Sequence, residues 1–184
     1  MKLKTLTFAF TALLSTTTFA TNISLGETLP SVTVSAHGEI LFNDDTLSYQ
    51  AWDTEQLSGK VRVIQAIAGR SAAKEMNSAL MDAITAADFP AEQYQTTTII
   101  NQNDALWGTG GFVKSSAESS KQEFSWSSMV LDADGAVQNA WDLSEKNSAI
   151  IVIDQIGKVL YFQEGKLSNE EIEQVVSLIS NTLY

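Results

Sequence analysis

The chain contains no cysteine among its 184 residues. This absence excludes thiol–disulfide exchange, peroxide reduction by a thiol, all-thiolate zinc sites and thiolate-held iron–sulfur clusters, because each needs a sulfur nucleophile or ligand. A single histidine, His37, gives little support to a His-rich metal site. The sequence therefore predicts no metal and no cofactor. Any catalysis or polar ligand binding would depend on carboxylates, Lys, Arg, Ser, Thr and backbone groups.

Basic residues are also scarce, with 11 Lys and Arg against 22 Asp and Glu. Lys2 and Lys4 account for two of the 11, so residues 21–184 carry 9 basic and 22 acidic residues and a formal charge of −13. Nucleic-acid binding usually depends on basic patches that neutralise phosphates. We therefore expect no DNA or RNA partner.

The first 20 residues have the pattern of a secretory signal peptide. Lys2 and Lys4 frame a basic start, the short apolar run TLTFAFTALL follows, and small residues surround Thr18-Phe19-Ala20. The apolar run is about half the length of a membrane-spanning helix of about 20 residues, and a buried N-terminal helix is the less favoured alternative. We expect cleavage after Ala20 and export of residues 21–184 without a membrane anchor.

Proline is nearly absent as well, since Pro30 and Pro90 are the two in the chain. No Pro-rich or Ser-rich linker and no internal repeat divides residues 21–184, which predicts a single domain. A chain of about 160 residues buries enough surface to fold without disulfides.

The first half of this domain has the pattern of a strand–helix–strand unit. The runs SVTVSA and EILF around His37-Gly38 predict an N-terminal hairpin, and VRVIQAI (61–67) predicts a strand covered on both faces. A helix capped by Ser71 follows and ends near Asp88, and TTTII (96–100) predicts the next strand. Such a crossover normally joins two parallel strands.

The second half predicts further strands and helices in alternation. We expect a helix over 112–123, a strand over 128–132, a short helix through Val137 and Trp141, and a hairpin joining 150–153 to 159–162. Ser168 and Glu171 have the spacing of a capping box, so the last helix begins there. These elements predict an α/β domain with a central mixed sheet flanked by helices.

Two segments resemble secreted thioredoxin-like proteins. LSGKVRVIQAIAGRSAAKE is similar to the strand and helix that a Cys-x-x-Cys turn joins in those proteins, and SAIIVIDQIGKVLYFQEGKLSNEEIEQVVSLI is similar to their final hairpin and helix. The segments AGRSAAKE, YQTTTIIN, GFVKSS, AWDL and VIDQIGKV together resemble the YtfJ family of bacterial periplasmic proteins. The resemblance covers nearly all of residues 21–184.

This resemblance implies a thioredoxin-like fold and a location in the periplasm, and the hairpin predicted above is then an N-terminal β-hairpin extension of that fold. It implies no particular activity. It places Gly69 and Ala72 at the two thiol positions and Ser148 near the cis-proline position that borders the thiols.

The turn in AGRSAAKE is the first candidate site. N–H groups at a helix start carry partial positive charge, and Arg70 and Lys74 add basic side chains. Gly69, Arg70, Ser71 and Lys74 are therefore a candidate site for a carboxylate or another anion, such as a peptide terminus. The alternative is a capped helix with exposed basic side chains and no ligand.

The segment WGTGGFVKS (107–115) is the second candidate, as a mobile loop or partner contact formed by Trp107, Gly108, Gly110 and Gly111. Its glycines permit positive φ angles. A phosphate loop of the form G-x-x-x-x-G-K-[ST] is disfavoured, because Val113 stands where the second glycine is required.

Other residues favour structural roles. Asp132-x-Asp134-Gly135 lacks the remainder of a calcium loop and is better explained as a turn, and His37 before Gly38 reads as an exposed turn residue. The four tryptophans are more typical of a core than of a ligand surface; they are Trp52, Trp107, Trp126 and Trp141.

Two functions remain open at this point. The first is a non-catalytic module that binds a periplasmic protein, a peptide or a small anion. The second is a thiol-independent enzyme that acts on a small anionic substrate through Arg70, Ser71 or Asp104. A buried carboxylate with a strongly perturbed pKa, in a pocket beside Arg70, would favour the enzyme, and a shallow, apolar or merely basic surface there would favour the module.

The signal-peptide pattern generates a first prediction. Because the basic start and short apolar core direct export, the protein should accumulate in the periplasm with Thr21 as its first residue. N-terminal sequencing of the protein from fractionated cells measures this directly. Recovery of the chain only from the cytoplasm, with Met1 still attached, would contradict it.

Overall fold

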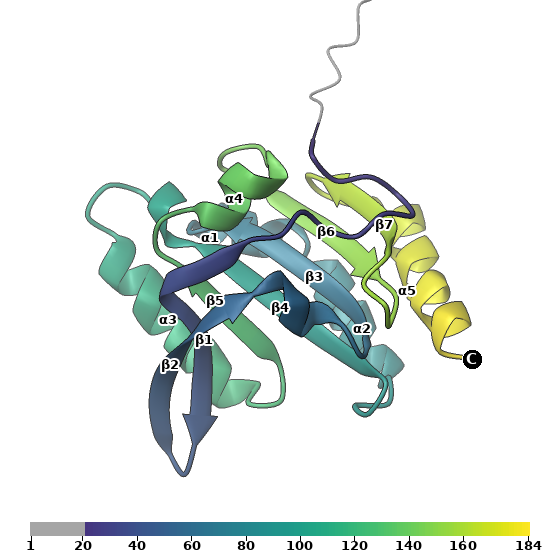
Figure 1. The fold of residues 1–184 in the computed structure, drawn as a ribbon, viewed down its shortest axis with the longest axis horizontal. Coiled ribbons are helices and arrows are strands. Elements are labelled where there is room, and N and C mark those ends of the chain that lie inside the picture. Colours follow the sequence, from purple (N-terminus) through teal and green to yellow (C-terminus); the bar gives the residue numbers. More distant parts are fainter. Residues whose placement is uncertain (1–20) are drawn as a thin grey trace, which may run out of the picture.

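Residues 21–184 are described by a computed structural model, and they form one seven-stranded mixed sheet with the strand order β2-β1-β5-β4-β3-β6-β7 (Figure 1). The predicted signal peptide and the cleavage after Ala20 lie outside the described residues. The strands are β1 (Thr33–Asn43), β2 (Thr46–Asp53), β3 (Val61–Ala68), β4 (Tyr94–Asn101), β5 (Ser128–Asp132), β6 (Ser148–Ile153) and β7 (Val159–Glu164).

Strand β3 lies in the interior of the sheet, and all of its residues are buried. It pairs in parallel with β4 and antiparallel with β6, and β4 pairs in parallel with β5. The predicted strand–helix–strand unit with a parallel pair is therefore confirmed. The apolar, β-branched sequence of β3 suits a strand that is covered on both faces.

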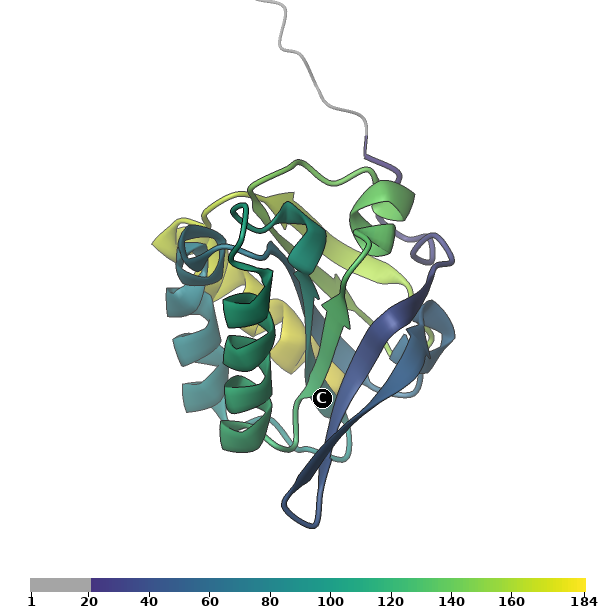
Figure 2. The same cartoon turned by 90° about the vertical axis from the view of Figure 1, so that its left-hand side faces the viewer.

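Helices cover the two faces of the sheet unequally (Figure 2). Four helices pack on one face: α1 (Ser71–Met76), α2 (Ser78–Ala87), α3 (Gly110–Glu123) and α5 (Asn169–Leu183). The other face is covered by α4 (Ala136–Trp141), the one-turn 3₁₀ helix η1 (Thr54–Leu57) and the segment 21–32. Since β3, β4 and β5 follow one another in one direction, right-handed crossovers place both connecting helical segments on one face.

The tryptophans divide between core and surface. Trp52 and Trp141 are fully buried in the face covered by α4, where they pack with Ile64 and Ile151. Trp107 and Trp126 are exposed, so the expectation of core positions holds for half of the set. Among residues 21–184 no helix is both long enough and apolar enough to cross a membrane.

The N-terminal hairpin exists, but its turn is not at His37-Gly38. Most of SVTVSA and all of EILF belong to the single strand β1, and the turn to β2 is made by Asp44 and Asp45, whose φ angles are 48° and 59°. His37 and Gly38 instead form a bulge in β1, with φ angles of 68° and 79°. Glycine is required there, because a Cβ on Gly38 would lie 2.1 Å from the carbonyl oxygen of Gln50.

The prediction of His37 as an exposed turn residue was therefore wrong. Its backbone pairs with Asp132 of β5, its side chain is half-buried, and its ring lies 5.3 Å from the ring of Tyr49. Positive φ angles serve bulges and turns alike, and the choice between them depends on residues far along the chain.

The helix expected after β3 is interrupted at Asn77, which separates α1 from α2. The Asn77 side chain is buried and donates hydrogen bonds from Nδ2 to Ser148 Oγ at 3.0 Å and to the Gly165 carbonyl at 2.9 Å. Its Oδ1 accepts a hydrogen bond from the Leu167 amide at 2.9 Å. One side chain thus joins the helix break to the start of β6 and to the segment before α5.

We predict that Asn77→Ala lowers the free energy of unfolding by about 2–4 kcal/mol, because a buried polar group left without a partner costs about 1–3 kcal/mol. Urea unfolding followed by tryptophan fluorescence measures the loss. Ser78→Ala, at the exposed neighbouring position, is the matched control and should change stability by less than about 0.5 kcal/mol. Equal effects of the two substitutions would contradict the proposed role of the Asn77 carboxamide.

Candidate functional site

The parallel strands β3, β4 and β5 deliver their carboxyl ends to one edge of the sheet, where ligands of open α/β sheets usually bind. The turn at Gly69 and Arg70 follows β3, the 3₁₀ helix η2 (Gln102–Asp104) follows β4, and the loop 142–147 precedes β6. The predicted turn site therefore lies at the edge where function is expected.

Glycine is required at position 69 because neighbouring atoms leave no room for a Cβ. Its amide donates to the Asn101 carbonyl at 2.8 Å, and an added Cβ would lie 2.8 Å from the same oxygen. That Cβ would also lie 3.3 Å from the side chains of Ala105 and Val113. The turn is thus packed directly against the segment that connects η2 to α3.

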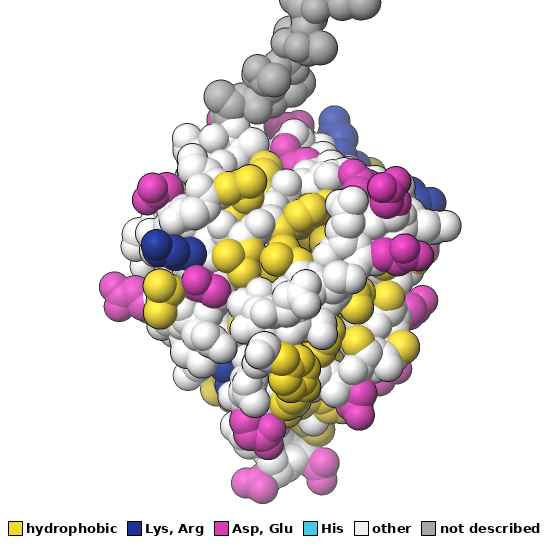
Figure 3. Space-filling view, turned by 90° about the vertical axis from the view of Figure 1, so that its right-hand side faces the viewer, with side chains coloured by type: hydrophobic (Ala, Val, Ile, Leu, Met, Phe, Trp, Pro, Cys, Tyr) yellow, Lys and Arg dark blue, Asp and Glu magenta, His cyan; other side chains and the backbone are white. Residues whose placement is uncertain are grey.

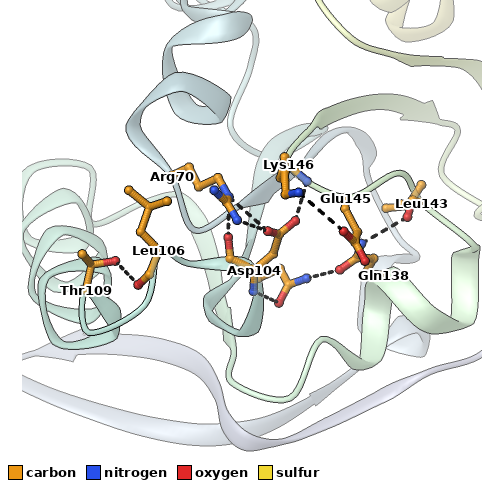
Figure 4. Close-up of polar contacts among 9 residues, drawn as sticks. Arg70, Asp104, Leu106, Thr109, Gln138, Leu143, Glu145 and Lys146 are labelled. Carbon is orange, nitrogen blue, oxygen red and sulfur yellow. Dashed lines mark hydrogen bonds and ion pairs between the residues drawn. The ribbon is translucent and has the colours of Figure 1, made fainter.

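Arg70 forms an ion pair with Asp104 (Figure 4). Arg70 Nη2 and Nε donate to Asp104 Oδ1 at 2.8 and 3.0 Å, and Nε also donates to the Asp104 carbonyl at 2.8 Å. The two side chains are only 22% and 9% exposed. The guanidinium that was expected to attract an external anion therefore already has an internal carboxylate partner.

Asp104 extends this ion pair into a network that fixes the loop before β6. Its Oδ2 accepts a hydrogen bond from the backbone amide of Lys146 at 2.5 Å. Its own amide donates to Asn101 Oδ1, and Asn101 Nδ2 donates to Gln138 Oε1 at 2.5 Å (Figure 4). Gln138 Nε2 in turn donates to the Leu143 carbonyl. Four segments of this edge are held in one arrangement.

A small cavity of about 20 Å³ lies beneath the network. Its lining includes Asn101, Asp104, Gln138 and Glu164. This volume is close to that of one water-sized probe and far below the roughly 300–1,000 Å³ of small-molecule sites. The cavity has no room for an organic substrate.

Ser71 does not cap α1. The N-cap position belongs to Arg70, whose side chain makes no capping hydrogen bond, and Ser71 is the first helical residue. The prediction of a Ser71 cap was wrong, because the backbone turns at Arg70 to bring its guanidinium to Asp104. Lys74 also has an internal partner, since its Nζ lies 3.4 Å from Ser120 Oγ on α3.

The second candidate segment is shorter than predicted. Gly110 and Gly111 form the first turn of α3, and Gly108 alone of the three glycines has a positive φ, at 80°. Three large apolar side chains are nevertheless exposed here: Leu106 by 58%, Trp107 by 101% and Phe112 by 78%. The sequence drew attention to Trp107, whereas the exposure of Leu106 and Phe112 was missed.

The positions at which the resemblance places the two thiols have other roles in this structure. Gly69 supplies the close backbone contact with Asn101, and Ala72 is an exposed residue of α1. Ser148 begins β6 with a trans peptide bond and accepts the hydrogen bond from Asn77.

The remaining acidic candidates are structural. Asp132 is buried and accepts hydrogen bonds from the amides of Ala136 and Val137, so it anchors the start of α4. Gly135 adopts a φ of 71° in the turn between them, as the turn interpretation requires. Within residues 21–184 no three acidic or histidine side chains gather closely enough to hold a metal ion.

The fold is that of thioredoxin-like proteins. It is similar to the thioredoxin domain of a thiol-disulfide oxidoreductase from Bacteroides vulgatus, with a TM-score of 0.57 and 15% identity over 85% of this chain and 98% of that one. It is also similar to a 2-Cys peroxiredoxin from Plasmodium vivax, with a TM-score of 0.54 and 13% identity over 85% of this chain and 96% of that one. The protein thus has a thioredoxin-like fold and contains no cysteine.

The sequence defines the family more narrowly. Residues 23–182 match the family described as "Bacterial protein of unknown function (YtfJ_HI0045)". The chain is 48% identical over 180 residues to an uncharacterized protein of Haemophilus influenzae, covering 98% of both. It is 44% identical over 158 residues to the uncharacterized protein YtfJ of Escherichia coli K12, covering 86% of both. The chain belongs to the YtfJ family, which confirms the resemblance seen in its motifs.

The Arg70–Asp104 pair generates a stability prediction. Asp104→Ala should destabilise more than Arg70→Ala, because it also leaves the Lys146 amide without its acceptor. A double-mutant cycle should give a coupling energy within the roughly 0.5–3 kcal/mol found for directly interacting side chains. Lys74→Ala is the control, with an expected change below about 0.5 kcal/mol. Additive effects of the two substitutions in urea unfolding would show that the pair is not coupled.

Proposed function

We propose that the protein is a non-catalytic, periplasmic binding module that docks a partner protein through Leu106, Trp107 and Phe112. The signal-peptide pattern and the resemblance to periplasmic proteins support the location. The observation that carries the binding role is the full exposure of Trp107 at the edge of the sheet that ligands of this fold class use.

The exposed side chains have the composition of a protein interface. Large apolar and aromatic residues dominate the binding energy at protein interfaces, and grouped exposed hydrophobics mark interaction sites. Ala105 and Val113, which flank residues 106–112, lie directly against the Gly69 turn. The turn and its hydrogen-bond network therefore support the apolar segment from below, as a rigid base.

The network also argues against a catalytic role for this edge. Both carboxylate oxygens of Asp104 are hydrogen-bonded within the protein, and the cavity beside them measures about 20 Å³. A general base must lie within hydrogen-bond reach of a bound substrate, and a cavity of this size holds none. The shallow apolar surface is the arrangement that favours the module over the thiol-independent enzyme.

A small anion is a weaker candidate than a protein. The Arg70 guanidinium is neutralised by Asp104, Lys74 contacts Ser120, and α1 has six residues. An anion would therefore compete with a carboxylate that is already in place, whereas a partner protein needs only the exposed apolar side chains.

We predict that a benzoylphenylalanine photo-crosslinker replacing Trp107 or Phe112 gives the same discrete adduct in the periplasm of living cells. The same analogue at Trp126 should give no such adduct. Trp126 is 69% exposed but follows the far end of α3, whose 14 residues span about 21 Å. Mass spectrometry of the purified adduct identifies the partner.

A second variant separates docking from chance collision. Trp107→Ala should reduce the adduct formed from position 112 by at least about fivefold, because aromatic anchors typically contribute more than 1 kcal/mol to binding. Absence of an adduct at both positions, or the same adduct from position 126, would overturn the proposal.

A further inference from the structure

A second concave surface lies at the other end of β3, away from Arg70. It is a groove of about 330 Å³, which falls in the range of small-molecule sites of roughly 300–1,000 Å³. Its walls are the segment 28–31, the 3₁₀ helix η1 with Ser58, and the turn between β6 and β7. The groove takes no part in the docking function proposed above.

The three walls are hydrogen-bonded to one another in a ring. The amide of Thr54 donates to the Val32 carbonyl at 3.2 Å, and the Val32 amide donates to Thr54 Oγ1 at 3.1 Å. The Gly59 amide donates to the Gln155 carbonyl at 2.8 Å, which joins η1 to the β6–β7 turn. A β-bridge at Thr28 connects that turn back to the first wall.

A buried cation fixes the η1 wall from within. Arg62 is 8% exposed, and its Nε and Nη2 donate to the carbonyls of Leu57 and Gln56 at 2.8 and 2.9 Å. Its Nη1 donates to Gln95 Oε1 and Thr97 Oγ1 on β4. Because η1 is tied to the central sheet in this way, the groove is preformed and does not depend on a ligand for its shape.

The lining combines an apolar floor with one negative charge. Leu29, Leu57 and Ile153 are its buried or half-buried apolar residues, and Ile156 at its rim is 70% exposed. Of the described residues that line the groove, Glu55 is the one that carries a charge. Its carboxylate is exposed and is not engaged by a hydrogen bond or ion pair among the described residues.

The neighbouring side of the molecule has the same character. Seen from the side of β7 and α5, hydrophobic side chains gather on the surface, and acidic side chains outnumber basic ones around them (Figure 3). Together with the formal charge of −11 of the whole chain, this surface favours cations over anions.

We propose that this groove binds a small organic cation, an ammonium group attached to an apolar body. The apolar body of the ligand covers the apolar floor of the groove and shields it from water. The ammonium group lies beside the carboxylate of Glu55. An anionic ligand of the same size would face Glu55 without a compensating cation in the lining.

Three probes that share a six-carbon chain and differ in their head group test this assignment: hexylammonium, hexanol and hexanoate. Each is titrated into isotope-labelled protein comprising residues 21–184, and amide and methyl shifts are recorded by NMR. We expect shifts at Ser58, Ile153 and Gly157, with affinity in the order hexylammonium, hexanol, hexanoate and at least about a fivefold difference between the first and the last. Hexanoate binding as tight as hexylammonium, or no shifts at these residues, would overturn the proposal.

Matched substitutions separate Glu55 from the net charge of the protein. Glu55→Gln should weaken hexylammonium binding about three- to tenfold and leave hexanol binding unchanged. Glu75→Gln removes a carboxylate that is also exposed, on α1 at the other end of β3, and should leave both unchanged. Equal losses in the two variants would show general attraction to an acidic protein and would overturn the site. Failure here leaves the docking proposal untouched, because that test uses different residues.

Discussion

The carboxylate of Asp104 holds together the segments that meet at the sheet edge proposed for docking. One oxygen accepts hydrogen bonds from the guanidinium of Arg70, and the other accepts one from the Lys146 amide. Parallel strands bring such segments to a common edge but do not fix them relative to one another. Because one carboxylate satisfies both, the turn after β3 and the loop before β6 adopt a single arrangement, and the segment that carries Leu106, Trp107 and Phe112 has a firm base.

This edge differs from a thiol site in its electrostatics as well as in its lack of sulfur. A reactive thiolate needs positive surroundings, such as a helix N-terminus or a nearby cation, to lower the pKa of its thiol. Here the guanidinium beside the turn is neutralised by Asp104, and Gly69 leaves no space for a larger side chain, since a Cβ would meet the Asn101 carbonyl at 2.8 Å. Cysteines placed at Gly69 and Ala72 would therefore not form a redox site. The residues at this edge pack against one another and leave apolar side chains such as Trp107 exposed.

Local sequence patterns were sufficient for most elements and insufficient for the site. The β-branched run of β3 and the capping box of Ser168 with Glu171 are short-range signals, and both were confirmed. The errors arose where a residue far away in the sequence determines the local structure. Asn77 interrupts the helix to reach partners 71 to 90 positions away, and Arg70 occupies the cap position to reach Asp104, 34 positions away. Propensity and capping rules consider only residues that are close in sequence, so they could not predict either contact.

The central strand links the two surfaces through a pair of arginines. Arg62, near the start of β3, holds the carbonyls of η1 and so shapes the groove, whereas Arg70, just after its end, holds Asp104 and so shapes the edge proposed for docking. Both cations are satisfied internally, and every residue of β3 between them is buried. A shift of this strand would therefore break the hydrogen bonds of Arg62 or Arg70 and disturb the surface at that end. Binding at either end should meet a preformed surface, and its strength should depend on the few exposed side chains, Trp107 at one end and Glu55 at the other.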